Sequence, residues 1–436
     1  MRPLQIASDN HLAGIDAQAW PGIVDIPAGI FAAKKARRAE SEFATACEHA
    51  GFILDGNEPD LTVLHEQLFA RIANAGWLGL AEGFMAEEWS SEQLVDVLLK
   101  LLEVGYRPRF GRATIGGDYT GAEIPDSLVR LFSGDGMSAH GTVFSSGVPT
   151  TVRTQVKSYV PRAGRGAEPA THFVDVTDLS APSLVERADL ADAQLRTLGM
   201  LLDSANVGMG THMLDFPSSG AALPIAAAQR QATVDVLTAD AARAKAIRDV
   251  LDMAEIDSSV HVELLDSILP NERTWPSNYD AIVSVEKLET LGEKTQRAYV
   301  RSLDRMLAKG GYIAIQTVIR GDNYSQAADR SLDVVRAYVT PALKYLSVEE
   351  LHRLFDAQTR LRIIEVTHVG QHYIHGLKMQ RETFEGKLRE AAASGFDKVY
   401  RNLWIFQLAL KEALFRFGAL DAVQLLITAR PQLRRR

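Results

Sequence analysis

A turn between a predicted strand and the helix after it, residues 214–221, is the first place in the chain where a ligand could bind. In an open parallel sheet the ligand sits at the carboxyl ends of the strands, where the connections diverge. A nucleotide or adenosyl ligand usually needs glycines there, because only backbone without side chains can approach it closely. Here Gly220 is the one glycine, and proline, serine and alanine surround it. On its own, the turn fits a ligand site and a sheet without a ligand equally well.

Other kinds of reactive site leave no pattern in the sequence. No Gly-x-Ser-x-Gly, P-loop or HExxH motif is present. The single cysteine, Cys47, excludes an intramolecular disulfide, a four-cysteine zinc site and a CxxC redox pair. Several histidines show no spacing that assembles a metal site, and we interpret them as scattered surface or core residues: His140, His172, His352, His368, His372 and His375. We therefore expect no metal site.

Composition places the chain among ordinary globular proteins. Its 436 residues predict two or three domains, at roughly 100–200 residues per domain. With 46% hydrophobic and 23% charged residues, it is not a disordered chain, a collagen-like repeat or a disulfide scaffold. The formal net charge of −8 argues against a protein that coats nucleic acid along its whole surface. We therefore expect no nucleic-acid partner.

From residue 189 onward, helical stretches alternate with short apolar strands. This alternation predicts an α/β fold, with a parallel sheet covered by helices on both faces. The expected strands are 212–216, 233–237, 260–264, 279–285 and 312–317, and the expected helices are 191–205, 222–229, 240–253 and 292–307. The stretch 382–426 is expected to be helical, with a strand-like tail after it.

The first part of the chain has a different pattern. Leu64, Leu68 and Ile72 recur at helical spacing, as do apolar residues between 94 and 101. Residues 103–170 are rich in Gly, Pro, Ser and Thr, which is typical of irregular structure. We therefore expect three parts: a helical N-terminal domain over 1–135, an irregular linker or lid over 136–184, and the α/β domain over 185–436.

No targeting or membrane-spanning segment is expected. Residues 1–25 lack the basic start, apolar core and cleavage site of a signal peptide. The longest apolar runs, 214–228 and 312–319, are shorter than the ~18–20 residues of a spanning helix. We expect a cytoplasmic protein whose only membrane contact would be peripheral. Basic groups are either solvated faces or sites that steer the chain to the anionic inner face of a membrane: 34–38, 162–165 and 430–436.

Residues 279–292 (YDAIVSVEKLETLG) resemble a hallmark of the cyclopropane-fatty-acyl-phospholipid synthases. That family includes the mycolic acid cyclopropane synthases and the actinobacterial fatty-acid methyltransferases, and block 76–90 is similar to the actinobacterial branch. Further blocks agree in the right order: 303–317, 372–381, 395–397, Trp404 and 412–424 (EALFRFGALDAVQ). The resemblance covers about residues 60–105 and 185–428, and by it the chain is identified as a member of the family.

The resemblance implies a Rossmann-like class I methyltransferase fold, with S-adenosylmethionine at the sheet edge and a lipid acyl chain in an adjoining apolar pocket. Members of the family transfer a methyl group to the double bond of an acyl chain. The resulting carbocation must lose a proton, and the family's bound bicarbonate is implied to accept it. Such a reaction needs a dry pocket and a positioned base. The smaller helical N-terminal domain is implied to contribute to dimerisation and lipid contact.

The cofactor positions depart from the family pattern. The family counterpart of residues 214–221 reads roughly Leu-Glu-Ile-Gly-Cys-Gly-Trp-Gly, and its three glycine positions hold Pro217, Ser219 and Ala221 here. Pro217 also removes an N–H donor. The family's Ser-x-Glu-Gln after the second strand becomes Thr-Ala-Asp-Ala, residues 238–241. By resemblance, the residues left to contact the cofactor are Asp215, Ser219, Gly220, Thr238 and Asp266, and Asp266 is equally well interpreted as a solvated loop residue.

The base site is also incomplete. Glu289 and Tyr373 match two residues of the family's bicarbonate site. The family's cysteine, in a Tyr-Ser-Cys-Ala-x-Phe block, has no counterpart, and residues 169–173 (PATHF) align there. The His-Tyr-Asp-x-x-Asn-Asp block that closes over the cofactor is not recognisable in 135–172. The alternatives are that Glu289 is a helix-surface carboxylate and Tyr373 an ordinary half-buried aromatic.

Two functions follow as hypotheses. In the first, the chain is a pseudoenzyme with impaired cofactor binding that acts by binding lipid acyl chains, phospholipid or a partner such as a lipid-modifying enzyme. In the second, it is an active S-adenosylmethionine-dependent methyltransferase that acts on an unsaturated acyl chain. We favour the first, because four separate losses of ~1–3 kcal/mol each would together exhaust micromolar affinity. A homodimer is compatible with both.

Overall fold

The computed structural model describes residues 11–26, 29–54, 58–109, 115–165, 168–256, 258–271, 275 and 278–430. They form two compact units, each assembled from separate stretches of the chain. The helical unit draws on Met1–Gly116, Asp322–Val339 and Phe384–Ala419, and the sheet unit on Gly117–Gly321, Thr340–Thr383 and Leu420–Arg436. This division differs from the expected 1–135, 136–184 and 185–436, because two late stretches join the helical unit.

Amphipathic helices make up most of the helical unit. They are α1 (Pro21–Val24), α2 (Ile30–His49), α3 (Gln67–Ala75), α4 (Trp77–Met85), α5 (Leu94–Glu103), α11 (Gln326–Ser331), α12 (Asp333–Tyr338), α15 (Leu388–Ala393) and α16 (Lys398–Arg416), with a short strand pair, β1 (Thr62–Val63) and β2 (Trp89–Ser90). The apolar side chains that recur along α5 are buried, and α16 packs against α4 and α5. This stripe is the expected apolar face of a core-facing helix.

A buried ion pair lies at the centre of the helical unit. Arg71 of α3 and Glu88 approach to 2.9 Å, and their side chains are 1% and 0% exposed. The Arg71 guanidinium also donates a hydrogen bond to the carbonyl oxygen of Ile23 at 2.5 Å. A Cβ at Gly79 of α4 would stand 2.1 Å from the carbonyl oxygen of Arg71. Only glycine therefore allows α3 and α4 to pack this closely.

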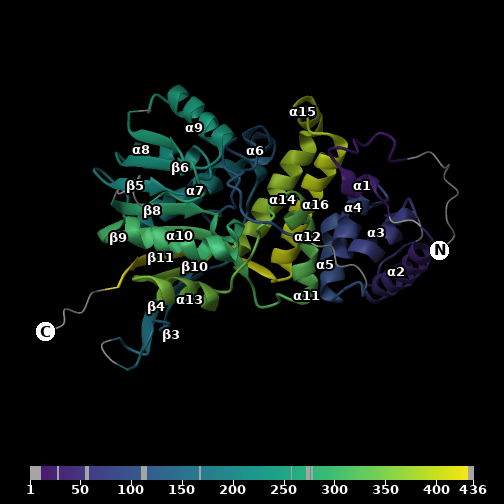
Figure 1. Cartoon of the computed structure of the whole chain (residues 1–436), viewed down its shortest axis with the longest axis horizontal. Helices are drawn as coiled ribbons and strands as arrows, with labels where there is room; N and C mark the ends of the chain where they lie inside the picture. Colours follow the sequence, from purple (N-terminus) through teal and green to yellow (C-terminus); the bar gives the residue numbers. More distant parts are fainter. Residues whose placement is uncertain are drawn as a thin grey trace. The chain divides into compact units, whose positions relative to one another are not determined.

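Within the described chain, the sheet unit is built on nine strands in the order β3-β4-β10-β11-β9-β8-β5-β6-β7 (Figure 1). They are β3 (Pro149–Lys157), β4 (Thr171–Leu179), β5 (His212–Asp215), β6 (Thr233–Thr238), β7 (Val260–Leu264), β8 (Tyr279–Val285), β9 (Leu307–Arg320), β10 (Leu361–His368) and β11 (Leu420–Ala429). From β9 through β8, β5 and β6 to β7, neighbours are parallel. The predicted parallel sheet is therefore confirmed for this half, whereas β11 runs antiparallel to both β9 and β10.

Helices cover both faces of the parallel half, as predicted. The sheet unit contains α6 (Asp126–Phe132), α7 (Leu190–Ser204), α8 (Ala222–Gln229), α9 (Ala241–Met253), α10 (Gly292–Met306), α13 (Val348–Gln358), most of α14 (Gly370–Gly386), and the short turns η1 (Arg187–Asp189) and η2 (Leu288–Thr290). Leu214 and Ile282 share a core cluster with residues of α10 and α13. Their neighbours Met213 and Val283 pack in a second cluster with α7, α8 and α9. Adjacent strand residues thus face opposite helical layers, as the pleat requires.

Three expectations about the sheet were wrong. Residues 136–184 are not an irregular linker, because they contain the antiparallel strands β3 and β4. β10 was not predicted. The helix expected to reach residue 426 ends at Arg416, and β11 begins at Leu420. The near-continuous apolar run of β11 is buried on both faces between β10 and β9, and such a run has no period that separates strand from helix.

Candidate functional site

The carboxyl ends of β5 and β8 form the topological switch point of the sheet. β6 and β7 continue from β5 on one side, whereas β8 and β9 lie on the other. In an open α/β sheet, ligands bind in the crevice outside such a point. Asp215 ends β5, and it is paired with Val283 of β8, three residues before Glu286. The crevice therefore lies between the turn after Asp215 and the segment that starts at Glu286.

Asp215 is fully buried, and one of its carboxylate oxygens is tied to the turn that follows. The Ser218 hydroxyl donates to Asp215 Oδ2 at 2.7 Å. The N–H of Gly220 in turn donates to Ser218 Oγ at 3.3 Å. Burial raises the pKa of Asp215 to about 7, although the Ser218 hydrogen bond and the Lys287 charge act in the opposite direction. Asp215 Oδ1 is buried without a hydrogen-bond partner among the described residues, so it is available to a donor.

The residues at the expected glycine positions of this turn have different surroundings. Ala221 is 5% exposed and belongs to the apolar cluster around α7, α8 and α9, so its side chain does not bear on the crevice. Pro217 is buried after a cis peptide bond, and Ser219 is partly exposed. At Gly220 φ is +144°, and a Cβ would stand 3.0 Å from the carbonyl oxygen of Met137. Glycine at position 220 therefore allows the backbone at Met137 to approach closely.

The end of β6 is already hydrogen-bonded within the protein. The hydroxyl of Thr238 accepts the N–H of Asp240 at 3.1 Å. The Asp240 carboxylate caps α9 by accepting the N–H of Arg243 at 3.0 Å. Its other oxygen accepts the N–H of Glu123 at 2.9 Å. Both oxygens of Asp240 are therefore engaged within the chain, and the next residue, Ala241, replaces the amide that was expected to contact the ribose.

Glu123 belongs to a stretch that crosses the carboxyl edge of the sheet, residues 117–141, which we call the edge segment. A Cβ at Gly121 would stand 2.8 Å from the Ala239 side chain after β6, and Met137 approaches the turn after β5 as described above. Two buried basic residues hold the segment, as Arg243 of α9 pairs with Asp126 at 2.5 Å and Lys287 pairs with Glu123. The covering element is thus earlier in the chain than the lid expected over 136–184.

The predicted adenine contact, Asp266, is the most accessible of the cofactor residues. It follows β7, it is exposed, and the described residues give it no hydrogen bond or ion pair. Its position is compatible with a ligand contact and with a solvated loop. Both interpretations of Asp266 therefore remain open.

Glu289 lies in η2, shortly after β8, and is not a helix-surface carboxylate. It is 5% exposed. The Thr317 hydroxyl donates to its Oε2 at 2.7 Å, and the N–H of Val318 donates to its Oε1 at 3.1 Å. Burial, followed by the charge of nearby Glu286, raises the pKa of Glu289 to about 7. A carboxyl group with such a pKa exchanges a proton near neutral pH.

Tyr373 of α14 is 2% exposed and joins a polar cluster with Glu286. Its hydroxyl donates to Glu286 Oε1 at 2.5 Å and accepts the amide of Gln316 at 2.7 Å. The described hydrogen bonds do not join Tyr373 to Glu289, but both lie close enough to Glu286 for its charge to act on their pKa values. Sequence reasoning missed Glu286, although it directly follows the predicted strand 279–285, where ligand-binding side chains are expected.

The block aligned with the family's cysteine lies at the start of β4. His172, within it, has its ring 5.9 Å from that of His352 in α13. Burial lowers the pKa of both histidines, that of His352 to about 4. Neutral imidazoles packed together in this way are consistent with core residues. Within the described residues, no group of three or more His, Cys, Asp and Glu is placed to hold a metal ion.

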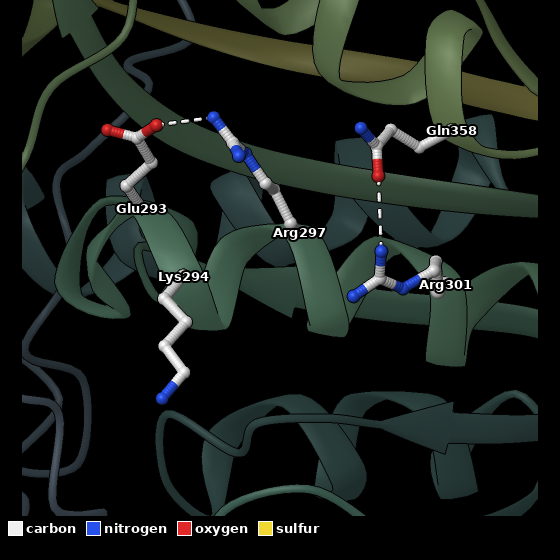
Figure 2. A pocket seen from close by; sticks show the side chains of 5 residues that line it. All are labelled: Glu293, Lys294, Arg297, Arg301 and Gln358. Carbon is white, nitrogen blue, oxygen red and sulfur yellow. Dashed lines mark hydrogen bonds and ion pairs between the residues drawn. The ribbon is translucent and has the colours of Figure 1, made fainter.

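A separate hollow of about 410 Å³ lies on α10 and the end of α13. Glu293, Lys294, Arg297, Arg301 and Gln358 line it (Figure 2). Figure 2 shows Arg297 paired with Glu293, and Arg301 donating to the Gln358 amide oxygen at 3.1 Å. The Glu293 and Arg297 side chains are 54% and 53% exposed, so solvent weakens their charges. This hollow has no buried reactive group, and the crevice between β5 and β8 is the better candidate.

Several polar groups around that crevice are already hydrogen-bonded within the chain. The Ser218 hydroxyl fills the turn after β5, and both oxygens of Asp240 are used by backbone donors. The predicted contacts Asp215 Oδ1, Ser219 Oγ and Asp266 have no hydrogen-bond partner among the described residues. The site also holds two neighbouring carboxyl groups, Glu286 and Glu289, and the pKa of Glu289 is raised to about 7. Among the described helices, none is long and apolar enough to span a bilayer.

The chain is similar in sequence to proteins of known family. Residues 181–425 match the family model described as mycolic acid cyclopropane synthetase. Over 439 aligned residues the chain is 27% identical to the tuberculostearic acid methyltransferase UfaA1 of Mycobacterium tuberculosis, an alignment that covers 96% of this chain and 97% of that protein.

Solved structures show the same fold. The cyclopropane synthase MmaA2 of Mycobacterium tuberculosis superposes with a TM-score of 0.50 at 21% identity, over 57% of this chain and 88% of that one. Coclaurine N-methyltransferase, solved with N-methylheliamine and SAH, gives a TM-score of 0.54 at 15% identity, over 81% and 97% of the two chains. The predicted α/β class I methyltransferase fold, with its helical N-terminal region, is thereby confirmed.

Proposed function

The chain belongs to the mycolic acid cyclopropane synthetase family, as its sequence blocks predicted, and we propose that it is a lipid-binding member whose S-adenosylmethionine site is impaired. The family consists of lipid-modifying, S-adenosylmethionine-dependent methyltransferases, and its model covers more than half of this chain. The full-length match to a tuberculostearic acid methyltransferase supports a long acyl chain as the lipid ligand. We therefore propose that this chain binds a lipid, as its family does, but does not transfer a methyl group to it.

One observation carries the proposal: after β6, beside the crevice, the carboxylate of Asp240 is fully used by hydrogen bonds within the chain. Asp240 aligns with the glutamate of the family's Ser-x-Glu-Gln block, and Ala241 replaces the amide that was expected to contact the ribose. The Asp240 carboxylate accepts the N–H groups of Arg243 and Glu123. Glu123 is further held by Lys287, and their side chains are 9% and 10% exposed. A cofactor that used Asp240 would have to displace the edge segment.

This displacement has an energetic cost that lowers cofactor affinity. Each internal hydrogen bond is worth about 0.5–1.5 kcal/mol net, and a hydrogen bond to a charged group about 1.5–3 kcal/mol. Breaking the Glu123–Asp240 bond and the buried Glu123–Lys287 pair would together cost several kcal/mol. Because each 1.4 kcal/mol is tenfold in affinity, a micromolar site would weaken to the millimolar range.

Titration calorimetry with S-adenosylmethionine and with S-adenosylhomocysteine tests the proposal. We expect no saturable binding to the wild type below roughly 100 µM, a threshold about 2.7 kcal/mol weaker than a micromolar site. A variant that combines Pro217→Gly with Ser219→Gly should gain affinity, because backbone could then approach the ligand. Ala221→Gly is the matched control and should gain none, since Ala221 packs in the core. Tight binding to the wild type would overturn the impaired-site proposal.

The lipid half of the proposal needs its own measurement. A fluorescent long-chain fatty acid should bind the wild type saturably without added cofactor, and a matched short-chain probe should bind much less, since affinity rises with buried methylene groups. Vesicles with and without anionic lipid test a peripheral membrane contact, and light scattering tests a homodimer. A lipid-modifying enzyme is the partner class we propose, and co-purification with a purified relative of this family tests it.

An active methyltransferase is the second candidate, and one observation favours it. Glu286, Glu289 and Tyr373 form a polar cluster beside the crevice. Asp215 Oδ1 has no hydrogen-bond partner among the described residues, so it can accept a hydrogen bond from a ligand. Transfer of a labelled methyl group from S-adenosylmethionine to phospholipid containing an unsaturated acyl chain distinguishes the two. Label in the extracted acyl chains, lost in Glu289→Gln, would establish the second function and exclude the first.

A further inference from the structure

Three hydrogen-bond donors converge on a single oxygen of Glu286. The backbone N–H of Gly141 lies 2.7 Å from Glu286 Oε1. The Tyr373 hydroxyl lies 2.5 Å from the same atom, and the Gln316 amide nitrogen lies 3.3 Å from it. Convergent donors of this kind bind a negatively charged oxygen, because each bond to an ionised acceptor is stronger than one to a neutral acceptor.

The donors are fixed before any anion is considered. Gln424 donates to the amide oxygen of Gln316 at 2.8 Å, which orients the Gln316 amide nitrogen toward Glu286 and Tyr373. Gln316 is fully buried and Tyr373 is 2% exposed. A Cβ at Gly141 would stand 2.2 Å from the Tyr373 ring, so the backbone donor can approach only as glycine. The donors thus form a rigid receptor for one oxygen atom.

The backbone at Glu286 is strained in a way that directs its side chain into this receptor. Glu286 directly follows β8 and has φ of +52°, in the left-handed region that non-glycine residues seldom adopt. Such a conformation costs roughly 1–2 kcal/mol and persists when the surroundings compensate for it. The three hydrogen bonds to Oε1 supply that compensation. Glu286 is only partly buried, and its second oxygen has no hydrogen-bond partner in the described residues.

We propose that the Gly141 N–H, the Tyr373 hydroxyl and the Gln316 amide form an oxyanion site, which the chain fills with its own Glu286 side chain. A small free carboxylate or bicarbonate therefore binds there only when that side chain is removed. The inference holds whether or not a cofactor binds, because it concerns donors and an acceptor that belong to the chain itself.

Glu286 lies close enough to two other titratable groups to act on them. Burial and the Glu286 charge together raise the pKa of Glu289, and the same two causes raise that of Tyr373 well above its usual value. Tyr373 therefore stays protonated and can donate at any ordinary pH. Because Glu286 Oε1 already takes all three donors, a second oxyanion in the same place would find no further donor.

Replacing Glu286 by alanine should leave a space of about the size of acetate. Glu286→Ala removes the Cγ methylene and the carboxylate, which together have the size of acetate. Thermal unfolding and titration calorimetry with acetate, formate and bicarbonate, each against equal sodium chloride, then measure whether the space takes an oxyanion. We expect acetate to bind this variant at least about tenfold more tightly than the wild type, the effect of one hydrogen bond to a charged group. Adding Tyr373→Phe to the variant should lower that affinity about tenfold again.

Two further variants keep the test decisive. Glu286→Gly relieves the left-handed backbone, so it is expected to fold even if Glu286→Ala does not. Glu293→Ala, which removes a carboxylate that is 54% exposed, is the matched control and should show no acetate response. The proposal fails if the wild type binds these anions as tightly as the Glu286 variants, or if the folded variants show no response beyond chloride. It also fails if Tyr373→Phe leaves the acetate affinity unchanged.

Discussion

The carboxylate of Asp240 accepts the backbone N–H of Glu123 at 2.9 Å, across 117 positions of sequence. The same carboxylate caps α9 through the N–H of Arg243. A single side chain therefore caps the start of helix α9 and also anchors the edge segment. At Asp240, the stability of α9 and the attachment of the edge segment are therefore coupled.

Asp240→Ala should loosen the edge segment and lower global stability together. Loss of the N-cap alone is expected to cost about 1–2 kcal/mol. Limited proteolysis should also cut faster within 117–141, because the Glu123 N–H loses its acceptor. Ser347→Ala is the control, since it removes the cap of α13, where Ser347 accepts the N–H of Glu350 at 3.2 Å. Equal proteolysis of the edge segment in both variants would contradict the coupling.

Glu289 should make stability fall as pH rises. Its pKa is about 7 when folded and near 4.5 in its ordinary state, so the folded protein binds the proton more tightly. The stabilisation is present below about pH 4.5 and is lost as pH rises toward 7, by on the order of 3 kcal/mol. Glu289→Gln should flatten the dependence of the unfolding free energy on pH between 5 and 8. Asp215, with a similar pKa, leaves a residual slope that Asp215→Asn should remove.

Two glycine-to-alanine changes should have opposite signs. Gly141→Ala places a Cβ 2.2 Å from the Tyr373 ring, and we expect a loss of at least about 2 kcal/mol. Gly199→Ala in α7 has its nearest atom, on Arg230, at 3.7 Å, and we expect a gain of about 0.5–1 kcal/mol. Urea unfolding of the two variants in parallel checks both signs. A neutral Gly141→Ala would show that the Tyr373 ring can move aside.

The buried pair in the helical unit predicts a further stability effect. Arg71→Met leaves the Glu88 carboxylate, which is 0% exposed, without its main partner. Such a loss is expected to cost about 3–5 kcal/mol. The double change Arg71→Met with Glu88→Leu should recover most of it, because the uncompensated charge is then gone as well. Denaturant midpoints of the single and double variants measure this, and a single variant as stable as the wild type would refute it.

The strands of the parallel half could be predicted because each is a short apolar run between turn residues. The expected 260–264 and 279–285 coincide with β7 and β8. β3 is exposed along nearly its whole length, so no buried face marks it in the sequence, and it is held by pairing with β4. The positions of β3 and β4 in the sheet could not be predicted without knowing that β10 lies beside β4. The local sequence pattern predicts a strand that has a clear apolar run. A strand without such a run is fixed by pairing with another strand that is distant in the sequence.

At the candidate site, sequence comparison pointed to Asp215, Glu289 and Tyr373, which the fold buries around the crevice. Their roles stay predictions. Sequence comparison could not predict the hydrogen-bond partners that alter the chemistry of these residues. Ser218 and Glu123 act through hydrogen bonds that exist only once the turn and the edge segment have folded. Ala221, judged from its aligned position to intrude on the cofactor, is instead a core residue.

The placement of β11 has a consequence for synthesis on the ribosome. This strand, Leu420–Ala429, lies between β9 and β10, and the helical unit also needs the late stretch Phe384–Ala419. Until residues 420–429 emerge, β9 and β10 have facing edges with unpaired N–H and C=O groups, which invite pairing with other chains. Neither unit can complete its structure before these residues emerge, so a nascent chain stalled before residue 420 exposes strand edges that a chaperone can shield.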